Sequence, residues 1–149
     1  MTPYQIITSK RVRLAVQAAV GMKQLERIDA LIGSRQKNGS TLDQGLIGTP
    51  GLLLPEYPEG AKPIYMSFVV HHSDRDKLAE TLRNKGVDTT VGYMNNMSDH
   101  PLFQEYRSNC PNATKANEQL LHLPVHPNLT PKDLNHMIHV VREACTVLS

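Results

Sequence analysis

The apolar positions in the first forty residues recur with a helical period. From residue 14 to about residue 36 the segment contains no proline, and apolar or small residues return about every 3.6 positions between charged ones: Leu14, Ala18, Gly21, Leu25, Ile28 and Ile32. The pattern predicts one long amphipathic helix over about residues 13–37. Asn38-Gly39 is expected to end it, because both residues tolerate the left-handed backbone found beyond a helix.

A stretch rich in glycine and proline follows this predicted helix. Residues 39–63 hold five glycines and four prolines, which interrupt regular structure and favour turns. The apolar triplet Leu52-Leu53-Leu54 lies within the stretch. We therefore expect an irregular connection with one short edge strand.

Strand and helix patterns alternate from about residue 62 onward. Ile64–His71 alternates between two faces, which is typical of a strand. Ser73 or Asp74 then begins a helix, and Gly86 marks its end. Val87–Tyr93 alternates again and predicts a second strand. The buried face of the intervening helix is expected to carry Leu78, Ala79 and Leu82.

A polar segment separates these elements from the last ones. Residues 94–110 lack helical periodicity, so they predict a loop with a short turn around residues 102–106. Pro111 suits the first turn of a short helix, because proline has the required φ and no N–H to satisfy.

The chain closes with a third strand and a final helix. Leu120–Val125 predicts the strand, in which Pro124 indicates an edge position or a strand end. Thr130 is placed as the helix cap, Pro131 as its first residue, and Asp133 near the positive end of its dipole. One apolar face follows, with Leu134, Ile138, Val141 and Cys145.

This order of elements predicts an α/β fold. Three short strands and helices that cover one face favour a two-layer sandwich with a small, mostly antiparallel sheet, preceded by the long N-terminal helix. A length of 149 residues fits a single domain, residues 1–149, with its α/β core over about residues 62–149. The remaining apolar surface favours contact with another domain or subunit.

Composition excludes several classes of protein. Charged residues make up 20% of the chain and the formal net charge is +2, with basic and acidic residues interspersed, so a nucleic-acid-binding surface is not indicated. No apolar run approaches the ~18 residues that a membrane span requires, and no leader-like segment opens the chain, so a cytoplasmic location is expected. Cys110 and Cys145 are expected to remain unpaired thiols.

The seven histidines permit a metal site but do not favour one. His136 and His139 lie one helical turn apart, and His122 and His126 flank Pro124. The first pair also suits the wet flank of the last helix, and we expect no metal. A catalytic pair of Cys110 thiolate and a histidine imidazole is also conceivable, but the spacing of these residues along the sequence does not favour it.

Several motifs together resemble the small domain of the DegT/DnrJ/StrS aminotransferases. The helix residues Gln17 to Gly21, Gln24-Leu25, Asp29 and Arg35 are similar to the family's opening helix. Later segments continue the resemblance over about residues 10–147: the strand and helix of residues 64–86, the loop with Tyr93, Pro101 and Phe103, and the closing motifs of residues 111–113 and 121–130.

The resemblance implies an enzyme that places an amino group on a nucleotide-linked keto-sugar with pyridoxal phosphate. The family's Schiff-base lysine and its acidic partner lie in an N-terminal cofactor-binding domain, upstream of everything seen here. None of the chain's lysines has that context: Lys10, Lys23, Lys37, Lys62, Lys77, Lys85, Lys115 and Lys132. We therefore expect this chain alone to bind no pyridoxal phosphate and to catalyse no transamination, and we expect a homodimer, as in the family.

The resemblance also assigns residues near substrate and cofactor. The family's active-site loop corresponds to residues 92–100, which brings in Tyr93, Asn95, Asn96 and Ser98, with Gly92 and Ser98 standing where the family has histidines. Ahead of the first helix, Lys10 and Arg11 stand near the family's asparagine that reaches a neighbouring subunit's cofactor phosphate. Either residue can hold a phosphate by charge.

Other interpretations remain open at this stage. Tyr93 fits a substrate-facing phenol and a half-buried tyrosine at a strand end equally well. The whole chain also fits a stand-alone α/β module that binds a small metabolite or a partner protein without catalysis. A ferredoxin-like RNA binder is disfavoured, because no aromatic pair lies on a central strand.

Overall fold

The computed structural model describes residues 10–92 and 96–148, with side chains from residue 14 onward. Its elements are, in chain order, α2 (Lys10–Leu25), α3 (Ile28–Leu46), β1 (Leu52–Leu53), β2 (Phe68–His72), α4 (Arg75–Asn84), the 3₁₀ helices η1 (Met97–Asp99) and η2 (Pro101–Tyr106), α5 (Pro111–Gln119), β3 (Leu120–Leu123) and α6 (Pro131–Leu148). Among the described residues, every helix is too short or too polar to span a lipid bilayer.

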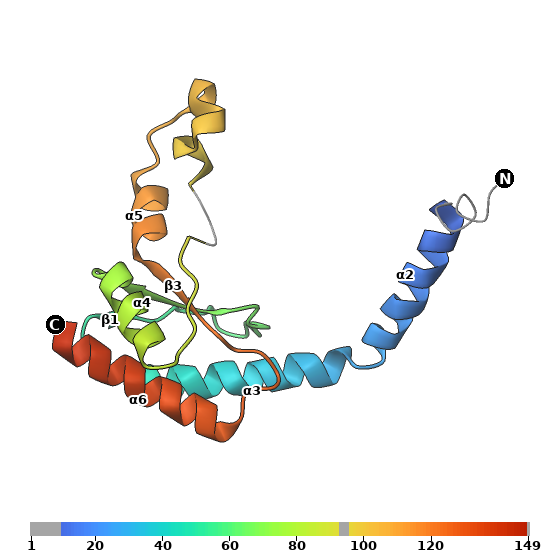
Figure 1. Cartoon of the computed structure of the whole chain (residues 1–149), viewed down its shortest axis with the longest axis horizontal. Coiled ribbons are helices and arrows are strands. Elements are labelled where there is room, and N and C mark those ends of the chain that lie inside the picture. The colour runs from blue at the N-terminus through green and yellow to red at the C-terminus, as the bar shows by residue number, and fades with distance from the viewer. Residues whose placement is uncertain (1–9, 93–95, 149) are drawn as a thin grey trace.

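A small antiparallel sheet forms one layer of the fold and helices form the other (Figure 1). The strand order is β1-β2-β3, with Leu52 opposite His72 and Phe68 opposite Leu123. The predicted α/β fold with a three-stranded antiparallel sheet is confirmed, and β1 is the short edge strand expected within the glycine- and proline-rich stretch.

One face of the sheet is buried against the helices. In β2 and β3 alternate side chains are inaccessible to solvent and pack with apolar residues of α3, α4 and α6. The core includes Leu42, Leu46, Phe68, Val70, Leu78, Leu82, Leu121, Leu123, Val141 and Cys145. Burial raises the pKa of the Cys145 thiol to about 11.

The long N-terminal helix differs from the prediction at two places. A turn at Glu26 and Arg27 divides it into α2 and α3, and the helix does not end at Asn38-Gly39 but continues to Leu46. Asn38 is buried, and its side-chain Nδ2 donates to the His126 carbonyl oxygen over 2.9 Å. Tertiary contacts therefore outweigh the local tendency of these two residues to end a helix.

Gly39 does not end the helix; it allows the Tyr65 ring to pack closely against α3. A Cβ at this position would lie 2.5 Å from the ring of Tyr65, so only a residue without a side chain admits the ring against α3. Tyr65 has a φ of 48°, and this left-handed residue interrupts the extended segment, so β2 begins at Phe68 instead of Ile64.

The predicted second strand, Val87–Tyr93, is wrong as a strand within the described residues. Only Thr90 pairs, through a bridge to His122 whose two backbone hydrogen bonds measure 3.1 and 3.0 Å. Val87 follows the left-handed Gly86 and donates its N–H to the Leu82 carbonyl oxygen over 2.9 Å, so the chain turns tightly after α4. This turn leaves a single point of contact with the edge of β3.

The later helices agree with the sequence. α4, α5 and α6 occupy the expected positions. β3 begins at Leu120 as predicted but ends at Leu123 instead of Val125, because Pro124 has no N–H to donate to a neighbouring strand. At the start of α6 the Asp133 carboxylate accepts from the Thr130 N–H over 2.9 Å and from its hydroxyl over 2.7 Å, while the Asp133 N–H donates to Thr130 Oγ1. This reciprocal arrangement is a capping box.

Replacing Gly39 by alanine should destabilise the domain by about 1–3 kcal/mol, because the new methyl group overlaps the Tyr65 ring. The matched control is Gly33→Ala in the same helix, where nothing lies within 4 Å of a new Cβ. That variant should gain about 0.5–1 kcal/mol from helix propensity. Urea unfolding of both variants provides the measurement, and a Gly39→Ala protein as stable as wild type would contradict the packing argument.

Asp133→Asn should lower the free energy of unfolding near neutral pH, and this difference from wild type should disappear in acid. Hydrogen bonds from the Thr130 N–H and hydroxyl hold the pKa of the Asp133 carboxyl below its ordinary value. A depressed folded-state pKa stabilises the protein above the unfolded value of about 3.9, and the stabilisation disappears as pH falls through the folded value. Thermal melts from pH 7 to pH 2 should therefore converge for wild type and Asp133→Asn, whereas Asp133→Glu, which keeps the charge, should follow wild type.

Candidate active-site loop

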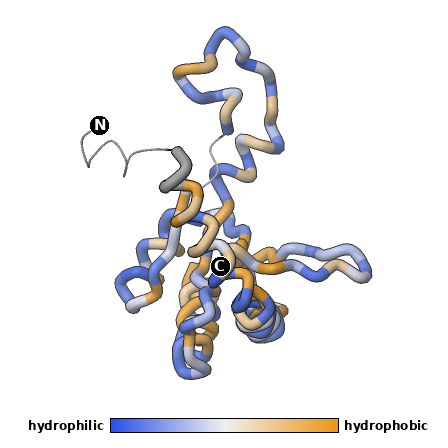
Figure 2. Tube along the Cα trace, turned by 90° about the vertical axis from the view of Figure 1, so that its right-hand side faces the viewer, coloured by the Kyte–Doolittle hydropathy of each residue, from blue (hydrophilic) through white to orange (hydrophobic). Residues whose placement is uncertain are grey.

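Residues 96–110 form a lobe that stands away from the sheet, beyond the start of α5 (Figure 1). The lobe contains η1 and η2 and buries no residue fully. Most of its residues are hydrophilic (Figure 2). Because it lacks an apolar core, polar contacts must hold its shape.

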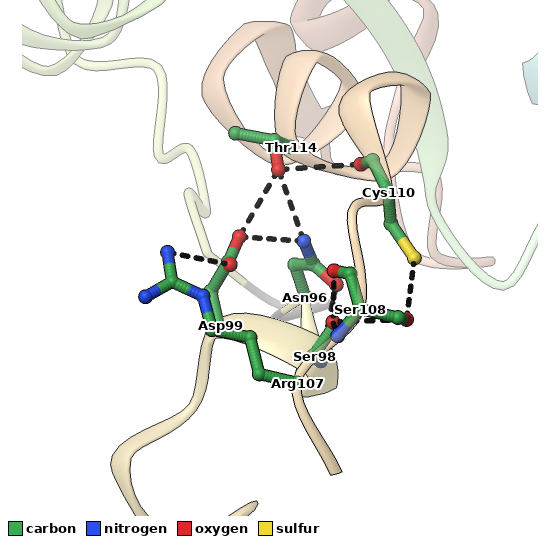
Figure 3. A network of polar contacts seen from close by, with 7 residues as sticks. All are labelled: Asn96, Ser98, Asp99, Arg107, Ser108, Cys110 and Thr114. Carbon is green, nitrogen blue, oxygen red and sulfur yellow. Dashed lines mark hydrogen bonds and ion pairs between the residues drawn. The ribbon is translucent and has the colours of Figure 1, made fainter. Parts of the chain in front are cut away.

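A cluster around Thr114 ties the lobe to α5 (Figure 3). The Asn96 Nδ2 donates to Thr114 Oγ1 over 3.0 Å and to Asp99 Oδ2 over 2.7 Å. Thr114 Oγ1 in turn lies 3.0 Å from Asp99 Oδ2. The Asn96 Oδ1 accepts from the Ser98 N–H over 3.2 Å and so begins η1. The Asn96 side chain therefore uses both its donor and its acceptor atoms within the lobe.

Ser98 and Ser108 close the base of the lobe (Figure 3). Ser98 Oγ donates to the Ser108 carbonyl oxygen over 2.6 Å and accepts from the Ser108 N–H over 2.9 Å. Ser108 Oγ lies 3.3 Å from the Sγ of Cys110, a free thiol. These contacts join positions that are ten residues apart and make residues 98–108 a closed loop.

An open hollow of about 470 Å³ lies beside this cluster, lined by Asp99, Arg107, Ser108, Asn109, Cys110 and Thr114. Arg107 Nη2 lies 3.6 Å from Asp99 Oδ1, and the Arg107 side chain is 67% exposed, so its guanidinium can turn toward a ligand at little cost. The lining offers hydroxyl, amide and guanidinium donors with one carboxylate, which suits a hydroxylated or phosphorylated ligand. Among the described residues, no group of histidine, cysteine and acidic side chains has the geometry of a metal site.

The structure brings together two of the predicted site residues, Asn96 and Ser98. Tyr93 and Asn95 lie outside the described residues. Lys10 and Arg11 begin α2, and their side chains also lie outside the description. α2 leaves the α/β layers on a different side from the lobe (Figure 1).

Sequence reasoning missed three members of the cluster: Asp99, Ser108 and Thr114. One local signal was available, because Asn96 and Asp99 have the spacing of residues that cap a short turn. The pairing of Asp99 with Thr114 spans 15 residues and has no signature in the sequence.

Thr114→Val should loosen the lobe without unfolding the domain. The substitution keeps the volume but removes the links to Asn96 and Asp99, and loss of about 1 kcal/mol would raise local opening roughly five-fold. Hydrogen exchange of peptides covering residues 96–108 is the measurement. Thr146→Val in α6 is the control, since that hydroxyl bonds only to the Arg142 carbonyl oxygen one turn earlier. Equal exchange in the two variants would show that Thr114 does not anchor the lobe.

Comparison with known proteins gives a consistent result. The model of the DegT/DnrJ/EryC1/StrS aminotransferase family matches residues 8–142. The chain is 30% identical over 131 residues to dTDP-3-amino-3,4,6-trideoxy-alpha-D-glucose transaminase of Streptomyces venezuelae, covering 86% of the chain and 35% of that relative. It is 26% identical over 137 residues to dTDP-4-dehydro-2,6-dideoxy-D-glucose 3-dehydratase of Saccharopolyspora spinosa, covering 86% and 30%.

Solved structures give the same coverage. The chain superposes on DesV of S. venezuelae with a TM-score of 0.80 at 29% identity, covering 87% of the chain and 36% of DesV. The aminotransferase TlmJ of Streptoalloteichus hindustanus matches with a TM-score of 0.76 at 31% identity, covering 89% and 36%. The chain thus spans about a third of the length of the relatives it matches.

Proposed function

This chain belongs to the DegT/DnrJ/EryC1/StrS aminotransferase family, and we propose that it forms the C-terminal small domain of a pyridoxal-phosphate-dependent nucleotide-sugar aminotransferase. The main support is that one α/β domain accounts for nearly the whole chain but for only about a third of its relatives. Residues 1–149 form a single domain in this proposal. The remaining two thirds of the enzyme then belong to an N-terminal cofactor-binding domain.

The described residues do not fit the demands of pyridoxal phosphate by themselves. The cofactor acts as an electron sink, and it needs a lysine amine in a desolvated site together with an acidic partner for its ring nitrogen. The seven lysines with described side chains are all exposed. Lys85, for example, forms a surface ion pair with Glu143 at 2.7 Å. These exposed lysines support the proposal that the reactive lysine comes from the N-terminal domain and that this chain alone holds no cofactor.

The 96–110 lobe contributes one wall of the substrate pocket in this proposal. Asn96 and Ser98 use their polar atoms inside the lobe, so they act as positioning residues. They set the course of the loop that carries Tyr93 and Asn95, whose side chains then contact the substrate. Lys10 and Arg11 supply positive charge for a phosphate group at the other end of the domain.

The exposed apolar residues of α2 support contact with other parts of the enzyme. Five of them are more than half exposed: Leu14, Val16, Val20, Met22 and Leu25. Water contact with such a cluster is unfavourable, which supports burial against the N-terminal domain and across a homodimer interface.

The reaction proposed is transfer of an amino group to a keto-sugar carried on a nucleotide. The S. venezuelae relative is named a transaminase of a dTDP-sugar, and the S. spinosa relative is named a dehydratase of one. Both names share the nucleotide-sugar substrate, which makes it the best supported part of this proposal.

Incubation of the chain with pyridoxal phosphate, followed by borohydride reduction and peptide mapping, tests whether the reactive lysine lies outside this chain. We expect only scattered, substoichiometric modification, because every described lysine is solvated. The S. venezuelae transaminase, treated in parallel, serves as the positive control and should carry one stoichiometric label. A stoichiometric adduct at a single lysine of this chain would overturn the proposal.

A further inference from the structure

A second polar hollow lies at the other end of the sheet, away from the lobe. Its volume is about 180 Å³, and its polar lining comes from four separate parts of the chain: Arg35, Ser67, Asp88, Thr90, His122 and His126. Arg35 belongs to α3, Ser67 precedes β2, and His122 lies on the face of β3 that the helices leave uncovered. None of these residues takes part in the cluster around Thr114.

Arg35 is the principal charge in this hollow. Its Nη1 donates to the carbonyl oxygens of Tyr65 and Met66 over 3.0 and 3.1 Å, and the side chain is half-buried. Within the described part of the chain, no carboxylate lies in ion-pair distance of its guanidinium. Two neutral carbonyls satisfy hydrogen bonds but leave the positive charge uncompensated, and its Nη2 and Nε still carry N–H donors.

The backbone beside Arg35 is held in a strained form. Tyr65 has a φ of 48°, which costs about 1–3 kcal/mol in a residue with a side chain. Ring contacts with Phe68 and Tyr57, both at centroid distances of 5.9 Å, keep it there. As a result, the carbonyls of residues 65 and 66 fix the guanidinium, and Ser67 follows directly beside it.

Hydroxyl groups supply the other donors. Ser67 Oγ lies 2.9 Å from His122 Nδ1, and Thr90 is held next to His122 by the backbone bridge. When Nδ1 carries the proton, Ser67 accepts from it and its own hydroxyl can donate toward the hollow. Burial lowers the pKa of His122, and a bound anion would offset this effect. Asp88, at the exposed side, is the one carboxylate among the lining residues.

We propose that this hollow binds the phosphoryl group of a small hydroxylated phosphomonoester. Donors that approach from α3, from the start of β2 and from the Thr90 segment surround a tetrahedral oxyanion better than a planar carboxylate. A space of about 180 Å³ has room for a short hydroxylated chain beside that group, and Asp88 accepts a hydrogen bond from one of its hydroxyls. The inference is independent of the proposed function, because it uses no residue of the 96–110 lobe.

Titration of the ¹⁵N-labelled chain with glycerol 3-phosphate, with inorganic phosphate and with acetate at constant ionic strength tests the proposal by NMR. The amides of Ser67, Thr90 and His122 should shift and saturate with glycerol 3-phosphate, more weakly with inorganic phosphate, and not with acetate. Shifts that are the same with acetate, or that do not saturate, would overturn it.

Two substitutions and one control sharpen the test. Ser67→Ala should weaken the affinity for glycerol 3-phosphate about ten- to one-hundred-fold, as expected for loss of a hydrogen bond to a charged group. Asp88→Asn should tighten binding of inorganic phosphate, since it removes a repelling charge. Ser73→Ala, an exposed serine beyond the other end of β2, should bind as wild type. Unchanged affinity in Ser67→Ala, with native spectra, would refute the assigned site.

Discussion

Burial of one face of a three-stranded sheet against three helices is the constraint on which the whole domain depends. Phe68, Val70, Leu121 and Leu123 alternate on that face and are almost completely inaccessible to solvent. Burial of each such side chain contributes about 1.5–3 kcal/mol, so the sheet cannot change register without exposing its core residues. The register in turn fixes the opposite face, where Ser67 and His122 meet, and it fixes the point from which α5 and the lobe project.

The lobe depends on a different kind of interaction. It has no buried residue, and its shape rests on hydrogen bonds among short polar side chains. Hydrogen bonds at a surface contribute less than apolar burial, so the lobe can open while the core stays folded. In the proposed function, a wall of this kind suits a pocket that admits and releases a bulky substrate, because its movement does not disturb the sheet.

Elements that are fixed by interactions between residues close in sequence could be predicted, whereas elements that are fixed by tertiary contacts could not. α4, α5 and α6 were predictable because their caps, prolines and apolar faces act within a few residues. The continuation of α3 past Asn38-Gly39 was not, because it depends on His126 and on the ring of Tyr65, which contact the helix only in the folded chain. The segment after Gly86 alternates like a strand, yet it meets β3 only at Thr90, since a tight turn directs the chain away from the sheet.

The candidate site, too, could be predicted only in part from the sequence. The family resemblance pointed to Asn96 and Ser98. The sequence alone does not reveal that Asn96 is hydrogen-bonded to Thr114 and Ser98 to Ser108. The hydrogen bonds of these two side chains to residues 99, 108 and 114 support the positioning role that the proposed function gives them. The position of a residue in a family motif therefore does not by itself give its hydrogen-bond partners, which are contacts made only in the folded chain.

Arg35 shows how a structural role and a binding role can share one side chain. Its Nη1 bonds to the carbonyls of residues 65 and 66 join α3 to the start of β2 and stabilise the left-handed Tyr65. A neutral donor could satisfy those carbonyls equally well, and a half-buried guanidinium that has no carboxylate partner among the described residues carries a desolvation penalty. The charge is therefore in excess of what the fold requires. A ligand that neutralises it would lower this penalty and tighten the same junction, which couples occupancy of the hollow to the stability of the α3–β2 contact.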